Sequence, residues 1–451
     1  MGTAPTRTLI VGSGAREHAL AWKLAGEPGM NEVYVAPGSA AIAAESRVRC
    51  LPNVDPLSPA SVAAAAQSVA AELVVIGPEA PLAAGVADAL TAAGIRVFGP
   101  SQAAARLESS KSFCHDVAEA AGVRMARART FEVRDGEAAA TCIRELGGAG
   151  RGIVLKQDGL AAGKGVVVYD DIELALEHLP TWLDPRRGEG PLLVVEERLE
   201  GLEASVIAIC DGRDAIAMPA SRDHKRLCDA DEGPNTGGMG AYSPLPDLPP
   251  EAIAEVIDTV HRPILAELAR RGTPFTGFLY AGLMLTTDGP RLLECNARLG
   301  DPEAQVLLPR LAGALGPVLA AAARGDVRSA PGTLTGTLPT FSGAAVGIVL
   351  ASRGYPGTPK VGMPIDGLQA AEGAGALVFH GGSIGRPGGG YGTNGGRVLT
   401  VVGRGPNLAR AREAAEAGAD RISWDGLHRR RDIAATVPAA PAAVTPVGAG
   451  R

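Results

Sequence analysis

The first hundred residues alternate short apolar runs with longer stretches in which apolar residues recur at helical spacing. The apolar runs are continuous rather than alternating with polar residues, which is typical of strands buried on both faces of a parallel sheet. The helical stretches supply the crossovers that parallel strands need. We therefore predict an N-terminal α/β domain over residues 1–108. Its expected strands are RTLIVG, EVYVAP, LVVIGPE and RVFGP, and its helices include EHALAWKLAG and PLAAGVADALTAAG.

Beyond Ser109 the hydrophobic pattern becomes a mixture of helices and strands, which predicts a second, α+β domain over residues 109–330. After Pro331 it changes to strands and turns followed by one helix, which predicts a small α+β domain over residues 331–433. Residues 434–451 are almost entirely Ala, Pro, Gly and Val and are expected to form a disordered tail. Within the second domain we expect helices in KSFCHDVAEAAG, EAIAEVIDTVHRPILAELARR and EAQVLLPRLAGALGPVLAAAARG, and strands in GIVLK, VVVY, PLLVVEERL, ASVIAI, GFLYAGLML and RLLECNA.

Composition narrows the possible functions. The 451 residues suit about three domains. A net charge of -6 provides no basic field for nucleic acid, and no apolar run reaches the length of a membrane span. The six cysteines are scattered singly, and no secretory signal is evident at the start, so we expect a cytoplasmic protein with free thiols. Sixty glycines indicate either low complexity or loops where backbone approaches a ligand closely.

A glycine turn follows the first expected strand, at Gly12-Ser13-Gly14-Ala15-Arg16-Glu17. It lacks the third glycine of a dinucleotide fingerprint, and the second strand does not end in an acid, which argues against an NAD site. Its backbone N–H groups at a helix start, beside Arg16, would suit a phosphate monoester. The alternative is a plain strand-to-helix turn.

A second glycine loop, Gly159-Leu-Ala-Ala-Gly163-Lys164-Gly165, resembles a nucleotide-hydrolase phosphate loop. The gap between glycines is one residue short, Gly165 stands where Ser or Thr would hold magnesium, and a strand follows instead of a helix. A glycine hairpin between strands can instead close over phosphates, with Lys156 within reach. The alternative is a purely structural hairpin.

The strongest chemical signal is Glu294-Cys295-Asn296-Ala297-Arg298. Alternate residues of a strand share a face, so Glu294, Asn296 and Arg298 are expected to point together while the residues between them enter the core. Carboxylate and amide oxygens suit Mg²⁺, and Arg298 could neutralise a transferring phosphoryl group. The alternative, a polar surface strand, is weakened by the acidic turn that follows.

Two further polar segments favour a nucleotide site. The strand that ends at Glu196 is followed by a turn and Glu203, which could offer backbone groups to adenine and a carboxylate to a ribose, although a solvated acidic turn would look the same. The segments 221–226 and 233–240 are too rich in turn residues for a core, and long loops of this kind are usually functional or disordered.

Together with VGSGAREHAL, VIGPEAPLAAGV and TNGGRV, the segments LKQDGLAAGKGV, SRDHKR, GPNTGGMGAYSP, FTGFLYAGLM and ECNARLGDPE closely resemble the phosphoribosylamine–glycine ligases (glycinamide ribonucleotide synthetases), which are ATP-grasp enzymes. The resemblance runs in order over residues 7–433. It implies an N-terminal substrate domain, an ATP-grasp domain with a lid over about 124–194, and a small C-terminal domain.

The resemblance also implies roles for individual residues. Magnesium or manganese ligands are implied at Glu294 and Asn296, and catalytic roles at Arg298 and Lys156. Implied ATP contacts are Lys111, Lys156, Gly163, Lys164, Gly165, Glu196, the backbone of Leu199, and Glu203. Implied substrate contacts are Gly12, Gly14, Arg16, Glu17, Glu79, Asp223, His224, Lys225, Arg298, Gly300 and Asp301.

The implied reaction joins glycine to 5-phosphoribosylamine through glycyl phosphate, with ATP as co-substrate, so the partners expected are small molecules. No side-chain nucleophile is required, which agrees with the lack of a Ser-His-Asp or Cys-His arrangement. The alternatives are an ATP-grasp ligase or carboxylase with another acceptor, and a non-catalytic nucleotide-binding relative. We expect a monomer, because no apolar exposed stripe is evident.

Overall fold

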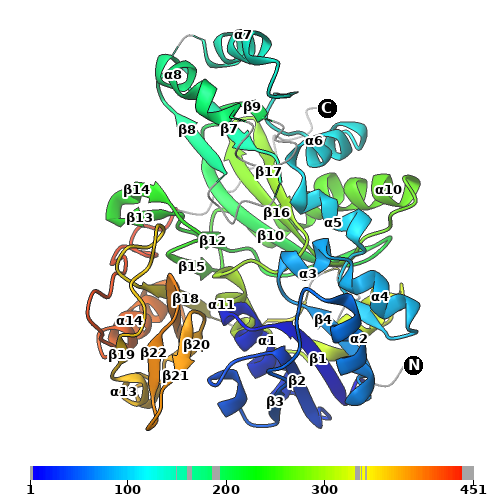
Figure 1. The fold of residues 1–451 in the computed structure, drawn as a ribbon, viewed down its shortest axis with the longest axis vertical. Helices are drawn as coiled ribbons and strands as arrows, with labels where there is room; N and C mark the ends of the chain where they lie inside the picture. The colour runs from blue at the N-terminus through cyan, green and yellow to red at the C-terminus, as the bar shows by residue number, and fades with distance from the viewer. Residues whose placement is uncertain are drawn as a thin grey trace, which may run out of the picture.

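The computed structural model describes residues 4–148, 150–159, 165–184, 193–330, 336, 338–340 and 343–438 (Figure 1). Most of the predicted disordered tail, residues 439–451, lies outside this range. The described chain remains packed beyond residue 433, since Ala434 is buried. Besides the elements below, short 3₁₀ turns occur at Ile42–Ala44, Asp229–Asp231 and Val327–Ser329.

The N-terminal domain is built on the predicted parallel sheet, with strand order β3-β2-β1-β4-β5. Helix α1 (Ala15–Ala25) follows β1, as predicted. The helix expected over 81–94 is interrupted at Gly85, whose φ of +80° is left-handed, giving α3 (Glu79–Ala83) and α4 (Val86–Ala92). The other elements are β1 (Arg7–Gly12), β2 (Glu32–Pro37), β3 (Val48–Cys50), α2 (Pro59–Ser68), β4 (Leu73–Ile76) and β5 (Val97–Phe98).

The expected lid forms a separate layer with a core of its own, at the top of Figure 1. Its antiparallel sheet has the order β6-β9-β7-β8. Side chains from this sheet and its two helices, among them Phe131, Leu155 and Trp182, pack together in one cluster. The elements are β6 (Ala128–Phe131), α7 (Gly136–Gly147), β7 (Ile153–Gln157), β8 (Val166–Tyr169), α8 (Ile172–Trp182) and β9 (Leu193–Glu197).

Beneath the lid lies an antiparallel sheet of order β11-β10-β16-β17, which contains the predicted strands. The single helix expected over 303–325 is wrong: the chain forms α11 (Glu303–Leu307), a 3₁₀ turn and α12 (Gly316–Ala322). Pro309 lacks an N–H and its ring clashes with the preceding turn, so the helix cannot continue. The other elements are α5 (Gln102–Ser109), α6 (Lys111–Ala120), β10 (Leu202–Asp211), β11 (Ala215–Ala217), α9 (Pro250–Val256), a π-helical segment (Ile257–His261), α10 (Arg262–Arg270), β16 (Thr276–Thr286) and β17 (Gly289–Asn296).

The C-terminal sheet includes strands from the preceding domain. Its order is β12-β15-β18-β23-β20, and β15 (Gly240–Ser243) pairs directly with β18 (Ala344–Ala351). Helix α14 (Leu408–Ala419) is the predicted helix, whereas the short α13 (Leu368–Gly373) was not expected. The other strands are β12 (Arg222–Asp223), β13 (Arg226–Cys228), β14 (Glu232–Asn235), β19 (Pro364–Ile365), β20 (Leu377–His380), β21 (Ser383–Gly385), β22 (Tyr391–Thr393) and β23 (Arg397–Gly405).

Candidate active site

The two predicted metal ligands lie at the end of β17. Neither Glu294 nor Asn296 makes a side-chain hydrogen bond or ion pair within the described part of the chain. Gly282 is paired with Glu294 across the sheet, and a Cβ there would lie 3.1 Å from Cγ of Glu294. The absence of a side chain at position 282 therefore leaves room for the carboxylate.

Cations surround this carboxylate. Burial alone raises the pKa of Glu294, but Lys225, Lys156, Arg298 and Lys111 outweigh that effect and hold the pKa below its usual range. An ionised carboxylate and an unpaired amide fit a hard divalent ion. The described residues contain no cluster of three or more His, Cys, Asp or Glu side chains that could hold a metal ion.

Lys156 is held in place by a buried carboxylate. Its Nζ lies 2.7 Å from Oε2 of Glu196 and donates to the carbonyl oxygen of Leu293 at 3.1 Å. The other oxygen of Glu196 is 2.7 Å from Nε2 of His115 on α6. Glu196, only 2% exposed, thus uses both oxygens to position neighbouring side chains. A contact of this residue with adenine stays a prediction, as does one with the backbone of half-buried Leu199.

Lys111 begins α6 and reaches the glycine loop, where its Nζ donates to the carbonyl oxygen of Gly159 at 3.0 Å. Asp158 fixes the start of the helix by accepting from Oγ of Ser112 at 2.6 Å and from the N–H of Lys111. The sequence interpretation missed Asp158, although it lies between two predicted phosphate contacts. Of the predicted loop contacts, Gly165 is described, whereas Gly163 and Lys164 lie outside the described residues.

Arg298 reaches the site from the turn after β17, so the expectation that it shares a strand face with Asn296 is wrong. The strand ends at Asn296, because the chain then turns towards the N-terminal domain. There Arg298 lies 3.3 Å from Glu79 and 2.9 Å from Glu108. Glu108, which the sequence interpretation missed, also accepts from the N–H of Ala297 at 2.7 Å. The prediction that Cys295 and Ala297 enter the core is confirmed.

The glycine turn after β1 is filled by the side chain of Glu17. This carboxylate accepts from the N–H of Gly14 at 2.7 Å and from Nε of Arg16 at 2.7 Å. A Cβ on Gly12 would lie 2.6 Å from Cγ of Glu17, so this glycine makes room for the carboxylate. The N–H of Gly14, which the sequence interpretation offered to a phosphate, is therefore occupied by the protein.

A cavity of about 250 Å³ opens beside this turn, where the three predicted domains meet. Arg397 lies 3.2 Å from the carboxylate of Asp301 across it. Burial raises the pKa of Asp301, but Arg397 and Arg16 outweigh it, so the net pKa is lowered and the carboxylate is ionised. The sequence interpretation assigned no role to Arg397, although it lies within the TNGGRV segment. The lining residues are Gly14, Ala15, Asp301, Gly381, Gly382, Gly395, Gly396, Arg397, Leu399 and Thr400.

The predicted acceptor segment lies between the central and C-terminal sheets. The N–H of His224 donates to Gly240 at 2.9 Å, and its carbonyl accepts from Met239 at 2.8 Å. Lys225 forms an ion pair with Glu203, the predicted ribose contact. Asp223 has no side-chain hydrogen bond or ion pair within the described ranges.

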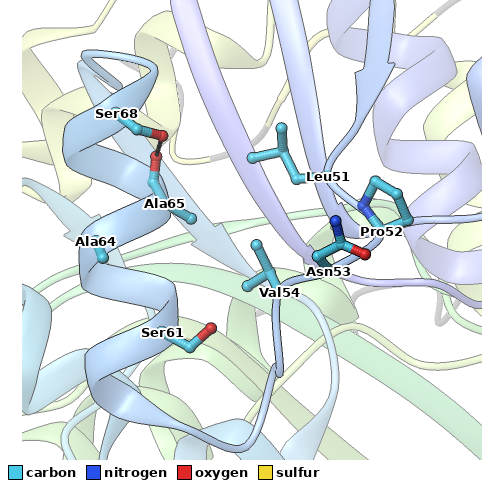
Figure 2. Close-up of a pocket in the computed structure, with 8 residues that line it drawn as sticks. All are labelled: Leu51, Pro52, Asn53, Val54, Ser61, Ala64, Ala65 and Ser68. Atoms are coloured by element: carbon cyan, nitrogen blue, oxygen red, sulfur yellow. Dashed lines mark hydrogen bonds between the residues drawn. The ribbon is translucent and has the colours of Figure 1, made fainter.

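A larger cavity, of about 400 Å³, lies away from these residues between α2 and the loop after β3 (Figure 2). Its polar side chains are Asn53, Ser61 and Ser68, and the hydroxyl of Ser68 donates to the carbonyl of Ala65. It contains no charged group that could bind phosphate or a metal. The catalytic site is therefore not assigned to this cavity.

The sequence was then compared with known families. Three phosphoribosylglycinamide synthetase models match it: the N domain at residues 6–108, the ATP-grasp (A) domain at 109–304 and the C domain at 345–436. The chain belongs to the phosphoribosylglycinamide synthetase family. The family and fold class inferred from the sequence are thereby confirmed. ATP-grasp enzymes use ATP and a divalent metal ion, and the assignment of Glu294 and Asn296 as its ligands stays a prediction.

Individual relatives cover nearly the whole chain. Phosphoribosylamine–glycine ligase of Streptomyces coelicolor is 46% identical over 432 residues, which is 95% of this chain and 99% of the relative. That of Neisseria meningitidis is 43% identical over 433 residues, 95% and 98% of the two chains. The crystal structure of the Thermotoga maritima ligase has a TM-score of 0.80 at 32% identity and covers 95% of this chain and 100% of that one.

A more distant structure agrees in fold alone. The biotin carboxylase domain of Hydrogenobacter thermophilus 2-oxoglutarate carboxylase has a TM-score of 0.67 at 15% identity, covering 95% of this chain and 92% of that one. Among the described residues, no helix is both long and apolar enough to cross a membrane.

Proposed function

We propose that this protein joins glycine to 5-phosphoribosylamine while converting ATP to ADP and phosphate, and so makes glycinamide ribonucleotide for purine biosynthesis. The relatives that match over nearly their whole length carry the name of this activity. The observation that carries the proposal is the pair of proposed oxygen ligands, Glu294 and Asn296, together with the four cationic side chains that keep Glu294 ionised. Such a site suits the transfer of a phosphoryl group to a carboxylate.

The cationic side chains would bind different phosphate groups. Lys111 and Lys156 would bind ATP phosphates, and Arg298 would neutralise charge on the transferring phosphoryl group. Mg²⁺ or Mn²⁺ held by Glu294 and Asn296 would neutralise phosphate charge when bound. The glycine carboxylate would attack the γ-phosphoryl group, and the amine of phosphoribosylamine would then attack the resulting acyl phosphate. Catalysis thus depends on positioning and charge rather than on a protein nucleophile.

The lid, about residues 124–194, would close over ATP. Its separate hydrophobic core allows it to move as a body, and closure would exclude the water that hydrolyses an acyl phosphate. Glu196 and Leu199 remain the proposed adenine contacts and Glu203 the proposed ribose contact. In the glycine loop, Gly163, Lys164 and Gly165 remain proposed phosphate contacts.

The two substrates other than ATP would bind beyond the end of β17, towards the N-terminal and C-terminal domains. The cavity between the predicted domains, with Arg397 and glycine backbone in its lining, would receive the ribose phosphate. The glycine turn and its neighbours Arg16, Glu17 and Glu79 would border this substrate. The remaining proposed substrate contacts are Asp223, His224, Lys225, Arg298, Gly300 and Asp301.

The test is ADP release measured with each substrate omitted in turn. Release that requires both glycine and phosphoribosylamine supports the proposal, whereas release with another amine or with bicarbonate alone points to a different ATP-grasp reaction. Glu294→Gln should lower kcat by at least about 100-fold, because it removes a charged ligand. The control is Glu255→Gln, at an exposed carboxylate on α9. Equal activity of the two variants would contradict the metal assignment.

We also propose that the protein is a cytoplasmic monomer. Large exposed hydrophobic side chains such as Leu57, Leu174 and Ile384 lie on different elements or loops. Light scattering coupled to size exclusion should give a mass near the 45.8 kDa of one chain.

A further inference from the structure

The segment 428–432, which follows the last helix, clamps the β13–β14 hairpin next to the proposed acceptor site. Besides the contact between Arg430 and Asp231 given below, four hydrogen bonds between described residues join the two segments. They link Nε2 of His428 with the carbonyl of Leu227 at 2.9 Å, NH1 of Arg430 with the carbonyl of Arg226 at 3.1 Å, the N–H of Arg431 with Asp229 at 2.7 Å, and the N–H of Ala230 with Asp432 at 2.8 Å. In Figure 1 the hairpin lies above the C-terminal part of the molecule.

The tip of the hairpin has an unfavourable backbone conformation. Ala230 and Asp231 have φ values of 60° and 53°, in the left-handed region that side chains with a Cβ rarely adopt. Such a conformation persists when several surrounding contacts stabilise it. The clamp supplies those contacts, because Asp432 binds the N–H of Ala230 and Arg430 binds the side chain of Asp231. The position of Asp231 is therefore set from the C-terminal segment.

Asp231 connects the clamp to a proposed substrate residue. Its Oδ1 lies 2.6 Å from NH1 of Arg430 and 3.8 Å from Nδ1 of His224. Arg430 is only 1% exposed, and its guanidinium also binds Asp432. His224 and Arg430 hold the pKa of Asp231 well below its usual range, so the carboxylate is ionised. Close contacts thus run from Arg430 through the ionised Asp231 to the ring of His224.

One ring nitrogen of His224 has no hydrogen-bond partner among the described residues. Hydrogen bonds to Met239 and Gly240 fix its backbone, and its Nδ1 faces Asp231. Its Nε2 is buried and has no hydrogen-bond partner among the described residues. An ionised carboxylate beside Nδ1 favours the proton on that nitrogen, which makes Nε2 of a neutral ring an acceptor. A buried acceptor without a donor is costly, so this atom points to a donor brought by a ligand.

We propose that Arg430 is a positioning residue that acts through Asp231 on His224, so that Nε2 of His224 accepts a hydrogen bond from an N–H or O–H group of the acceptor substrate. This inference rests on the proposed function, in which the acceptor is phosphoribosylamine. It assigns to the C-terminal segment a role in acceptor binding and none in ATP binding.

The test compares variants along this chain. Asp231→Asn keeps the size of an exposed side chain but removes its charge, and Arg430→Met removes the other end of the clamp. Each should raise KM for phosphoribosylamine about tenfold while KM for ATP stays unchanged. Arg430→Lys, which keeps the charge, should recover part of the loss. Arg429→Met is the matched control, because the side chain of Arg429 is only 5% exposed, against 1% for Arg430, but pairs with Glu416 and Asp420 instead of the hairpin.

A double-mutant cycle separates positioning from general stability. If Arg430 acts through His224, Arg430→Met should have no further effect on KM in a His224→Ala background. Additive effects, an unchanged KM in Asp231→Asn, or equal effects of Arg429→Met and Arg430→Met would overturn the proposal. Its failure differs from failure of the proposed function, which would appear as a wild-type protein without turnover on glycine and phosphoribosylamine.

Discussion

The buried pair between Lys156 and Glu196 makes a quantitative prediction about the lid. The side chains are 9% and 3% exposed, so neither charge is well solvated. In Glu196→Ala the ammonium of Lys156 would keep only the carbonyl of Leu293 as a close partner. Breaking a buried pair on one side typically costs about 3–5 kcal/mol. We expect a loss of that size in the free energy of unfolding of the lid.

The adjacent acid is the control. Glu197 pairs with Arg127 and Arg291, whose side chains are 63% and 23% exposed, so solvent screens these interactions more than the pair of Glu196. Exposed pairs contribute about 0–1 kcal/mol, and Glu197→Ala should therefore cost far less. The two variants differ by one position along β9 and remove the same chemical group.

Urea unfolding followed by tryptophan fluorescence measures the effect. Trp182 belongs to the lid core, and Trp22 and Trp424 are the only other tryptophans, so replacing those two by Phe makes the signal specific to the lid. A loss below about 1 kcal/mol in Glu196→Ala would refute the reasoning about the buried charge. Burial raises the pKa of Glu196, but Lys156 and His115 lower it by more, so the pKa in the folded protein lies below its unfolded value. The stabilisation is therefore present above the unfolded pKa. It should disappear as pH falls through the folded pKa.

Three further predictions concern other buried groups. Burial and repulsion by Asp223 raise the pKa of Glu303 to about 7, so the folded protein retains a proton that the unfolded chain releases from about pH 4.5 upward. Glu303→Gln should therefore raise Tm at pH 8.5 and change it little at pH 4. Burial lowers the pKa of His261 to about 4, and the folded protein should lose about 2 kcal/mol between pH 8 and pH 5 from this group alone. In His261→Leu, urea unfolding at the two pH values should show a smaller loss. Gly282→Ala places a Cβ 3.1 Å from Cγ of Glu294, so it should weaken metal activation several-fold, measured by titrating Mg²⁺, while Tm changes by only a few degrees.

Continuous apolar runs predicted the buried strands well, because a strand such as β1 is apolar along most of its length. Such a strand can be predicted from its own sequence, without knowing which strand it pairs with. The helix over 303–325 was overpredicted, since apolar spacing continues through Pro309 although the backbone cannot. Two short strands, β12 and β15, could not be assigned to the C-terminal sheet. Strand β12 pairs with β15, and β15 joins the sheet through β18, about a hundred residues later, so nothing local specifies that pairing.

The site residues show the same contrast between local sequence signals and long-range contacts. Glu294 and Asn296 stand out in sequence because one strand presents both side chains. Glu108 and Asp231 do not, since each acquires its role only from an arginine far away in the chain. Arg298 illustrates both cases: its importance was visible beside the metal ligands, whereas its partners on the N-terminal domain were not.

The pairing of β15 with β18 limits how this chain can be divided. A fragment that stops before residue 343 would leave β15 with an open edge of N–H and C=O groups, ready to pair with another chain. It would also lose the segment that holds the hairpin tip in shape. The lid, by contrast, has its own core and is one continuous insert in the sequence. Lids could therefore be exchanged between relatives as cassettes, whereas the second and third family domains would have to be inherited and transplanted as one piece.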